Sequence, residues 1–328
     1  MSTMAHDNDR NDWQLITDLR YENFEEFNEA VHGWDFNFHQ LTSGRSKTGL
    51  LQIGHPDFLI SRFFLEQAYD QRGSLPSGVM TFGIPEAGDN EVITPGGIAQ
   101  QDDILCIPSG HELVALTQPH FKAHSVSISE KLINEVAESC GLQRIRPVAY
   151  PSQKVLRCDP EKTAVLRKKL RSISSSLEQI KKTDSCSAIF RELEFSLIQH
   201  LLLMISESRP TDKLKISKIK HARLLRALNY IEANADKPVT VLELAQETGS
   251  TVRTLEYIYR DYFNVTPKAF LKSHRMNAVH SELHTALDRK VTIKEIANHW
   301  GFWHLSQFAV DYRRFFGELP SETVNKHM

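Results

Sequence analysis

The segment "TIKEIANHWGFWHLSQFAVDYRRFFGELP", Thr292–Pro320, decides how the C-terminal part of this chain is interpreted. It opens on a threonine, passes through a short apolar run to a glycine, and continues as a second amphipathic run that ends before a proline. A threonine can cap the N-terminus of a helix, and a glycine supplies the left-handed conformation that ends one. The segment therefore predicts two short helices separated by a tight turn.

A second segment upstream has the same order: "TVLELAQETGSTVRTLEYIYRDYFNVTP", Thr240–Pro267. The identical pairs are Thr240 and Thr292, Glu243 and Glu295, Ala245 and Ala297, Gly249 and Gly301, Tyr259 and Tyr312, Arg260 and Arg313, Phe263 and Phe316, and Pro267 and Pro320. The run between the two copies, "TPKAFLKSHRMNAVHSELHTAL", predicts one long connecting helix. Two helix-turn-helix units on one chain predict a protein that reads the DNA major groove.

The exposed positions near the start of each second helix are the candidates for reading base edges. They are Thr251, Arg253, Glu256 and Tyr257 in the first copy, and His304, Leu305, Ser306, Gln307 and, at the margin, Val310 in the second. Arginine suits guanine, glutamate the cytosine amino group, glutamine adenine, and leucine the thymine methyl group. Leu255 and Phe308 are expected to anchor these helices in the core, with Phe302, Tyr312 and Phe316 beside Phe308.

Five basic residues further along these elements are candidates for phosphate contacts. They are Arg260, Lys268, Lys272, Arg313 and Arg314. Arg260 and Arg313 could instead bridge to Glu243 and Glu295, because all four positions repeat. The acidic residues Glu256, Asp261 and Asp311 on the second helices are departures, because a carboxylate repels phosphate. Trp303 has two open interpretations: a cap on the core or a contact with the sugars of the DNA backbone.

The charge of the chain is divided unevenly. The span from Lys213 to Met328 holds 18 basic and 12 acidic side chains, whereas the rest of the chain holds 21 basic and 29 acidic. The net charge of the whole chain is −2, which by itself points to no partner. The C-terminal span has an excess of basic residues and the rest of the chain an excess of acidic ones. This division favours the C-terminal span as the part that binds a polyanion.

The N-terminal part of the chain has a different sequence pattern. Residues 36–129 hold short β-rich runs between turn residues, which predicts a small barrel or sandwich. Residues 130–207 predict helices. The last of them carries a wide apolar face from Phe190 to Ile205 that packs on the β-domain, forms a homodimer seam, or does both. We therefore predict an N-terminal domain over 1–207, a linker over 208–220 and a DNA-binding domain over 221–328.

The residues from Ala222 to Met328 resemble the AraC/XylS family of transcription regulators. The matching motifs are "EIANHWGF", "FAVDYRRFFG", "GELP" and, in the connecting helix, "RMNAVHSEL". The resemblance implies an α+β protein with an all-α C-terminal domain of two helix-turn-helix motifs, and a cupin-like N-terminal barrel that senses a small-molecule effector, forms a homodimer, or both. It also implies promoter DNA and RNA polymerase as partners. The run "TVLELAQ…WGFWHLSQFAVDY" is further similar to the ethanolamine-operon regulator branch, which would imply a small amine or a cobalamin as effector.

Several classes are not expected. The chain has no nucleophile elbow, phosphate loop or paired-carboxylate motif, so no enzymatic activity is expected. Its histidines form no H-x-H step, so neither a metal nor a cofactor is expected. The most apolar stretch, Phe195–Ile205, is far shorter than the roughly 20 residues that cross a membrane, and the polar N-terminus favours the cytoplasm. Three alternatives remain: a regulator controlled by a partner protein, a cupin-type enzyme with a helical appendage, and an architectural nucleic-acid binder.

Overall fold

The structure is a computed structural model, which describes residues 13–21, 26–27, 35–88, 90–95, 97–142, 153–180, 187–210, 218–263, 265–285 and 291–325. The chain forms two compact units. The first comprises Met1–Asn37, Lys47–Glu66 and Gln71–Lys213, and the second comprises Phe38–Ser46, Gln67–Asp70 and Leu214–Met328.

Two sheets form most of the first unit, and the strand pairs of the larger one are all antiparallel. The larger sheet has the strand order β1 (Gln14–Tyr21), β3 (Thr48–His55), β4 (Phe58–Leu65), β11 (Phe121–Ser129), β6 (Val79–Pro85), β9 (Asp103–Ile107), β12 (Lys154–Arg157) and β13 (Arg209–Pro210). The smaller sheet has the order β2 (Asp35–Gln40), β5 (Tyr69–Ser74), β10 (Glu112–Thr117), β7 (Val92–Thr94) and β8 (Gly97–Ala99). The prediction of a β-rich N-terminal region in an α+β protein is confirmed.

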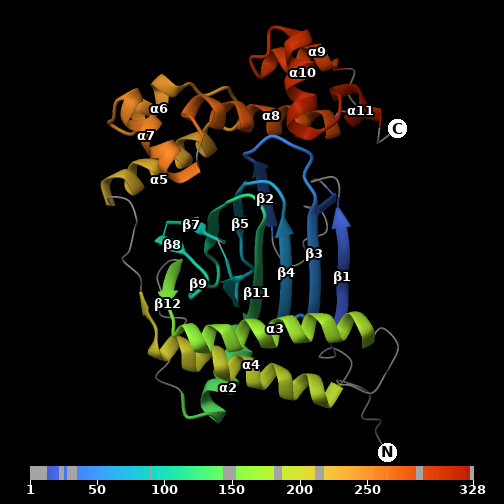
Figure 1. The fold of residues 1–328 in the computed structure, drawn as a ribbon, viewed down its shortest axis with the longest axis vertical. Helices are drawn as coiled ribbons and strands as arrows, with labels where there is room; N and C mark the ends of the chain where they lie inside the picture. Colours follow the sequence, from blue (N-terminus) through green and yellow to red (C-terminus); the bar gives the residue numbers. More distant parts are fainter. Residues whose placement is uncertain are drawn as a thin grey trace, which may run out of the picture. The chain divides into compact units, whose positions relative to one another are not determined.

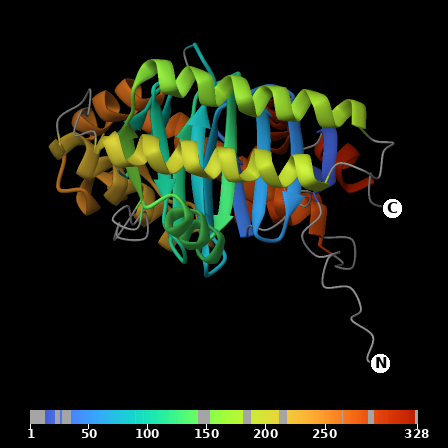
Figure 2. The ribbon, with the colours of Figure 1, turned by 90° about the horizontal axis from the view of Figure 1, so that it is seen from below.

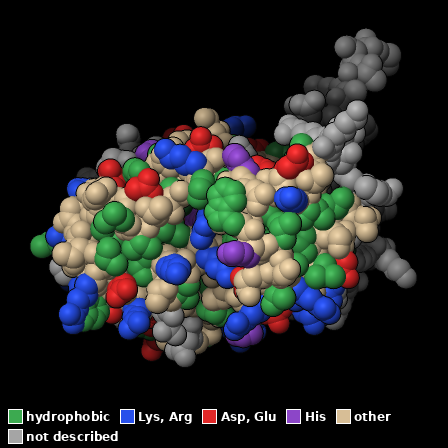
Figure 3. Space-filling model, turned by 90° about the horizontal axis from the view of Figure 1, so that it is seen from above, with side chains coloured by type: hydrophobic (Ala, Val, Ile, Leu, Met, Phe, Trp, Pro, Cys, Tyr) green, Lys and Arg blue, Asp and Glu red, His purple; other side chains and the backbone are tan. Residues whose placement is uncertain are grey.

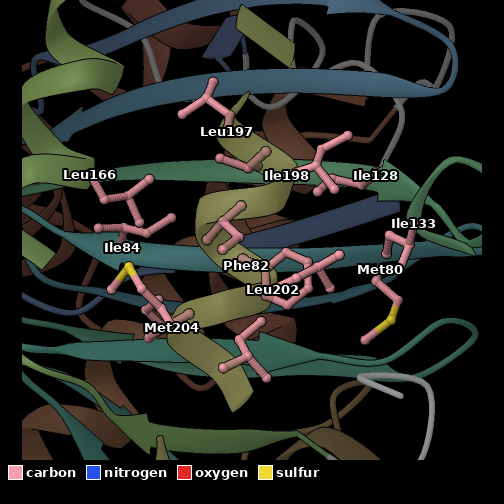
Figure 4. Close-up of a cluster of buried hydrophobic side chains, with 14 of the residues drawn as sticks. Met80, Phe82, Ile84, Ile128, Ile133, Leu166, Leu197, Ile198, Leu202 and Met204 are labelled. Atoms are coloured by element: carbon pink, nitrogen blue, oxygen red, sulfur yellow. The ribbon is translucent and has the colours of Figure 1, made fainter. Parts of the chain in front are cut away.

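Three helices cover one face of the larger sheet (Figure 2). They are α2 (Glu130–Ser139), α3 (Pro160–Ile180) and α4 (Ser187–Glu207). Alternation along the strands sends every second side chain toward these helices. The core on this face includes Phe82 of β6, Val126 of β11, Leu166 of α3 and Leu202 of α4, each at most 1% exposed. Figure 4 shows that the α4 side chains point between the strands of this sheet.

The apolar face of α4 packs within its own domain. Leu197, Ile198, Leu201 and Leu202 are each 1% exposed and belong to the core against the larger sheet. Packing of this face on the β-domain is therefore confirmed, and a homodimer seam stays a prediction. Among the described residues, α4 leaves the apolar side chains Leu193, Phe195 and Leu203 exposed, and Leu193 belongs to the predicted face.

Some elements do not follow from the sequence pattern. The run Gln14–Tyr21 forms β1, and Lys154–Arg157 forms β12 within a region expected to be helical. Part of the predicted linker is paired, since Arg209 and Pro210 form β13 against β12, and α5 begins at Lys218. The rest of the linker, residues 211–217, lies outside the described residues, as do residues 1–12. The domain boundaries at 207 and 221 therefore stay a prediction.

The second unit is helical from residue 218 onward (Figure 1). Its helices are α5 (Lys218–Ala233), α6 (Val241–Glu247), α7 (Val252–Phe263), α8 (Pro267–Thr285), α9 (Ile293–His299), α10 (Leu305–Phe316) and α11 (Pro320–Asn325). These bounds confirm the two predicted helix pairs, α6–α7 and α9–α10, and the long connecting helix α8. Among the described residues, none of the helices of either unit is long and apolar enough to cross a membrane.

Candidate DNA-binding interface

Each helix pair opens on the same N-terminal cap. Thr240 Oγ1 accepts a hydrogen bond from the Glu243 N–H, and the Glu243 carboxylate accepts from the Thr240 N–H at 2.7 Å. Thr292 and Glu295 repeat this capping box, again with 2.7 Å between the Thr292 nitrogen and the carboxylate. Hydrogen bonds from the capping threonines lower the pKa of both glutamates, because they favour the ionised form.

The capping boxes explain why a glutamate repeats in the two copies. Among the described residues, no ion pair joins Arg260 to Glu243 or Arg313 to Glu295. Both arginines are exposed. The interpretation of these four positions as two structural bridges is therefore wrong, and both guanidinium groups face the solvent.

The two turns after these caps are also alike. Gly249 has φ +57° and Gly301 has φ +78°, the left-handed conformation that the sequence predicts there. The residue after each glycine donates its N–H back into the first helix: Ser250 to the Ala245 carbonyl and Phe302 to the Ala297 carbonyl, both at 2.9 Å. This pattern ends α6 and α9 and directs the chain into α7 and α10.

One side of each second helix is fixed in the core. Leu255 and Tyr259 of α7 are fully buried, and Phe308 and Tyr312 of α10 are 2% and 0% exposed. Trp300 is buried in the same cluster as Phe308, beside the glycine turn. The predicted anchors Leu255, Phe308 and Tyr312 are confirmed, whereas Phe302 and Phe316 are only partly buried against the cluster and Phe315 is buried in it. Because these anchors face inward, the opposite sides of α7 and α10 face the solvent.

The connecting helix α8 packs against both pairs. Its Phe270 ring lies 5.0 Å from the ring of Tyr259 on α7. Further along, His280 Nδ1 is hydrogen-bonded to the Tyr312 hydroxyl of α10, and the Arg275 guanidinium lies 5.2 Å from the ring centre of Phe302 in the second turn. Burial lowers the pKa of Arg275. Since one continuous helix contacts both pairs, it fixes their separation.

The four predicted base-reading residues of the first copy are exposed at the start of α7. Thr251 also caps the helix, because its hydroxyl oxygen accepts the Thr254 N–H at 3.1 Å. Arg253 donates from Nε and Nη2 to the Tyr257 hydroxyl, at 3.4 and 3.2 Å. Two of the predicted readers therefore hold each other on the surface, with Glu256 beside them.

The predicted readers of the second copy are placed less uniformly. His304, Ser306 and Gln307 are exposed, whereas Leu305 is half-buried and packs against the core of the domain. The His304 carbonyl accepts the Phe308 N–H at 2.8 Å, but the imidazole makes no capping bond. Gln307 Nε2 donates to Asp311 Oδ1 at 3.2 Å. The second copy thus presents a polar group of three side chains rather than four.

The predicted phosphate contacts fall into two groups. Arg260, Lys268, Arg313 and Arg314 are exposed. Lys272 is different, because its ammonium lies 2.7 Å from Asp311 Oδ2 in an ion pair between α8 and α10. The acidic Asp261 of α7 is similarly paired with Lys220 of α5 at 2.9 Å. Two of the three acidic departures, Asp261 and Asp311, therefore have a cationic partner.

Two exposed residues near the base-reading candidates had no single interpretation from the sequence. Trp303 is 72% exposed in the turn before α10, so its interpretation as a cap on the core is wrong. Val310 is 62% exposed one turn after Ser306. No sequence pattern separates an exposed tryptophan from a buried one in a run of aromatic residues. The i, i+4 spacing of Gln307 and Asp311 was a usable signal for their contact.

The surface on the side of α6, α7, α9 and α10 has a mixed character. Figure 3 shows Lys, Arg and His side chains at several places on this face, with hydrophobic and uncharged surface and Asp and Glu side chains between them. Positive charge interspersed with hydrogen-bonding groups suits a surface that meets both phosphates and base edges. These features define the class: a DNA-binding domain with two helix-turn-helix motifs.

The comparisons with known proteins agree with this class. A family model described as a helix-turn-helix domain matches residues 244–326. The chain is 38% identical over 98 residues to the probable thc operon regulatory protein of Rhodococcus erythropolis, covering 30% of each chain. It is 31% identical over 101 residues to the XylDLEGF operon transcriptional activator of Pseudomonas putida, covering 31% of this chain and 32% of that one. The match thus spans about a third of these relatives' length.

Solved structures of regulators are similar to a third of the chain or to a larger part of it. A probable AraC family transcriptional regulator from Rhodopseudomonas palustris is 33% identical, with 32% of this chain and 97% of that chain covered and a TM-score of 0.30. The match to the AraC-like transcriptional activator CuxR covers 81% of this chain and 96% of that chain, at 13% identity and a TM-score of 0.42. The C-terminal part of this chain belongs to the AraC/XylS family of DNA-binding transcriptional regulators. These relatives are not enzymes, in agreement with the prediction from sequence.

Proposed function

We propose that this protein regulates transcription by reading two successive major-groove segments of one promoter, α7 in one and α10 in the other. The observation that carries the proposal is the duplicated helix-turn-helix, in which the same cap, turn and anchor leave a polar side of each second helix exposed. Because α8 fixes their separation, both helices can enter one face of the duplex about 34 Å apart. DNA bending would accompany binding wherever this spacing differs from the helical repeat.

Residues of α7 and α10 would contact base edges, and basic residues near them would contact phosphates. Arg253 would contact guanine, Glu256 the amino group of cytosine, and Gln307 adenine, since these pairs match in donors and acceptors. Thr251, Tyr257, His304, Ser306 and the half-buried Leu305 would complete the base-reading set. Arg260, Lys268, Arg313 and Arg314 would hold the phosphates. The exposed Trp303 would pack on the sugars of the backbone, the interpretation that its exposure supports.

The first unit would sense an effector, form the homodimer, or both. Apolar side chains on the outer face of α3 and α4 support a dimer: Val165, Leu193, Phe195 and Leu203 are 36–47% exposed. The similarity to operon activators supports activation, with RNA polymerase as partner, in the cytoplasm. The ethanolamine-branch resemblance would make the effector a small amine or a cobalamin. Control by a partner protein is the alternative for this unit.

The test of DNA reading is a binding titration. Fragments recovered from a random duplex library by the purified protein should share a motif, and a consensus duplex should bind at least about a thousandfold more tightly than its scrambled version. Affinity should fall steeply with salt, because exposed arginines and lysines displace counterions from phosphates. An architectural binder would instead retain all duplexes equally, and that result would rule out sequence-specific regulation through these helices.

A further inference from the structure

Asp311 is the centre of a small polar network on the exposed side of α10. Its Oδ1 accepts from Gln307 Nε2 at 3.2 Å, and its Oδ2 accepts from Lys272 Nζ of α8 at 2.7 Å. The Asp311 side chain is 22% exposed and the Lys272 side chain 41%. Each carboxylate oxygen thus serves one neighbour, and the network joins a predicted base-reading residue to a predicted phosphate contact.

The first consequence concerns the orientation of the Gln307 amide. A carboxylate can only accept, so the amide must turn its NH2 group, not its oxygen, toward Asp311. The carbonyl oxygen and the second N–H of Gln307 are then left together on the side away from Asp311. Adenine offers an N6 amino donor and an N7 acceptor in the major groove, which this pair of groups matches. Asp311 therefore prepares Gln307 for adenine before DNA arrives.

The second consequence concerns charge. An ion pair this exposed adds little to stability, and a carboxylate on a groove-facing helix repels phosphates. Pairing with Lys272 cancels this repulsion, but it also withholds the lysine from the DNA backbone. The network would therefore exchange one phosphate contact, which strengthens binding to every sequence alike, for one oriented reader, which strengthens binding only where its base is present.

The first motif has no equivalent of this network. The repeat aligns Asp311 with Ile258, which is fully buried, and Gln307 with Thr254. Asp261 of α7 does form a comparable exposed ion pair, with Lys220, but its described hydrogen-bond partner is that lysine and not a reader. The molecule thus contains a matched control: two helix-surface aspartates, each paired with a lysine, of which one holds a base-reading side chain.

We propose that Asp311 is a positioning residue that fixes Gln307 for adenine and keeps Lys272 from the phosphates. This inference rests on the proposed function, because it requires that α10 enters the groove.

The experiment compares Asp311→Ala, Asp311→Asn and Asp261→Ala in the full chain, using the consensus duplex, a copy with the adenine opposite Gln307 replaced by guanine, and a random duplex. In Asp311→Ala we expect discrimination between adenine and guanine to fall about tenfold. Binding to random DNA should tighten, and its salt dependence should steepen by about one phosphate contact, a slope change of roughly 0.9. Asp261→Ala should keep the discrimination of the unchanged protein.

Two further variants separate the two roles of Asp311. Asp311→Asn keeps an acceptor for Gln307 but loses the charge, so random binding should tighten while most of the discrimination remains. In the Asp311→Ala, Lys272→Ala double variant, the salt slope should return to its original value while discrimination stays lost. Circular dichroism of each variant checks that it is folded, and Asp311→Asn, of equal size, provides the test if the alanine variant is not.

The outcomes that would overturn the inference are distinct from failure of the proposed function. If Asp311→Ala binds DNA and discriminates adenine from guanine as well as the unchanged protein, Asp311 does not position Gln307. If Asp261→Ala loses discrimination equally, the effect belongs to surface charge in general and the inference is wrong. If the unchanged protein prefers no sequence at all, the proposed function fails, and this inference fails with it.

Discussion

Replacing Phe308 with alanine is expected to lower the stability of the C-terminal domain by about 3–5 kcal/mol. Phe308 is 2% exposed and lies in a cluster with Met276 and Val279 of α8 and Ile296 of α9. Its ring is 5.2 Å from that of Phe302 and 5.5 Å from that of Tyr312. Removing the ring leaves a cavity that this rigid helix packing can fill only in part. Because each 1.4 kcal/mol is about a tenfold change in an equilibrium constant, the fraction of molecules in which the second motif is open should rise by about two to four orders of magnitude.

The matched control for this variant is Val310→Ala on the same helix. Val310 is 62% exposed, so its truncation should change the stability by less than about 0.5 kcal/mol. Urea unfolding with hydrogen exchange of peptides from α9 and α10 measures both variants. We expect faster exchange in these peptides and weaker DNA binding for Phe308→Ala alone. Equal unfolding midpoints for the two variants would mean that Phe308 does not anchor the reading helix.

Replacing Gly54 with alanine is expected to have a comparably large effect on the first unit. Gly54 lies near the end of β3 with φ +149°, and a Cβ there would lie 2.0 Å from the Phe58 carbonyl oxygen and 2.9 Å from the Leu59 Cα. Both obstacles are backbone atoms of the paired strand β4, in which Leu59 is the register partner of Gly54. They can move aside only if the hairpin opens. We expect a loss of at least about 3 kcal/mol, beyond the usual range for a single substitution.

Gly49 in the same strand provides the control. A Cβ on Gly49 would lie 3.6 Å from the Phe64 Cβ, an ordinary contact. Gly49→Ala should therefore keep a stability near that of the unchanged protein, and both proteins can be compared by urea unfolding monitored by circular dichroism. If Gly54→Ala is as stable as Gly49→Ala, the β3–β4 hairpin does not have the close approach described above.

The helical domain was predictable because its signals are local and occur twice. Threonine caps, glycine turns and period-3.6 anchors lie within a few residues of one another, and the repeat gave each a second occurrence. The outward direction of Arg253 and Gln307 followed from the inward direction of Leu255 and Phe308. The pairing of Lys272 with Asp311 did not follow, because the two residues are 39 positions apart and meet only when α8 packs against α10.

The first unit was less predictable, for a physical reason that its strands illustrate. Runs such as Phe58–Leu65 carry enough β-branched and aromatic residues to be recognised, whereas "YDQRGS", Tyr69–Ser74, becomes β5 through pairing with distant strands. The apolar face of α4 had two interpretations from sequence, since packing on a sheet and packing on a second copy require the same residues. Burial of Leu197 and Ile198 against the sheet confirms the first interpretation, and the homodimer seam stays a prediction.

The central claim is that both second helices read bases, in two grooves of one site. The most direct measurement is a hydroxyl-radical and missing-base footprint on the consensus duplex, with Arg253→Ala and Gln307→Ala beside the unchanged protein. We predict two clusters of base contacts about 10–10.5 base pairs apart on one face of the duplex, with Arg253→Ala erasing contacts in one cluster and Gln307→Ala in the other. Each substitution should cost about 1–3 kcal/mol of binding. A single cluster, or the loss of the same contacts in both variants, would contradict the claim.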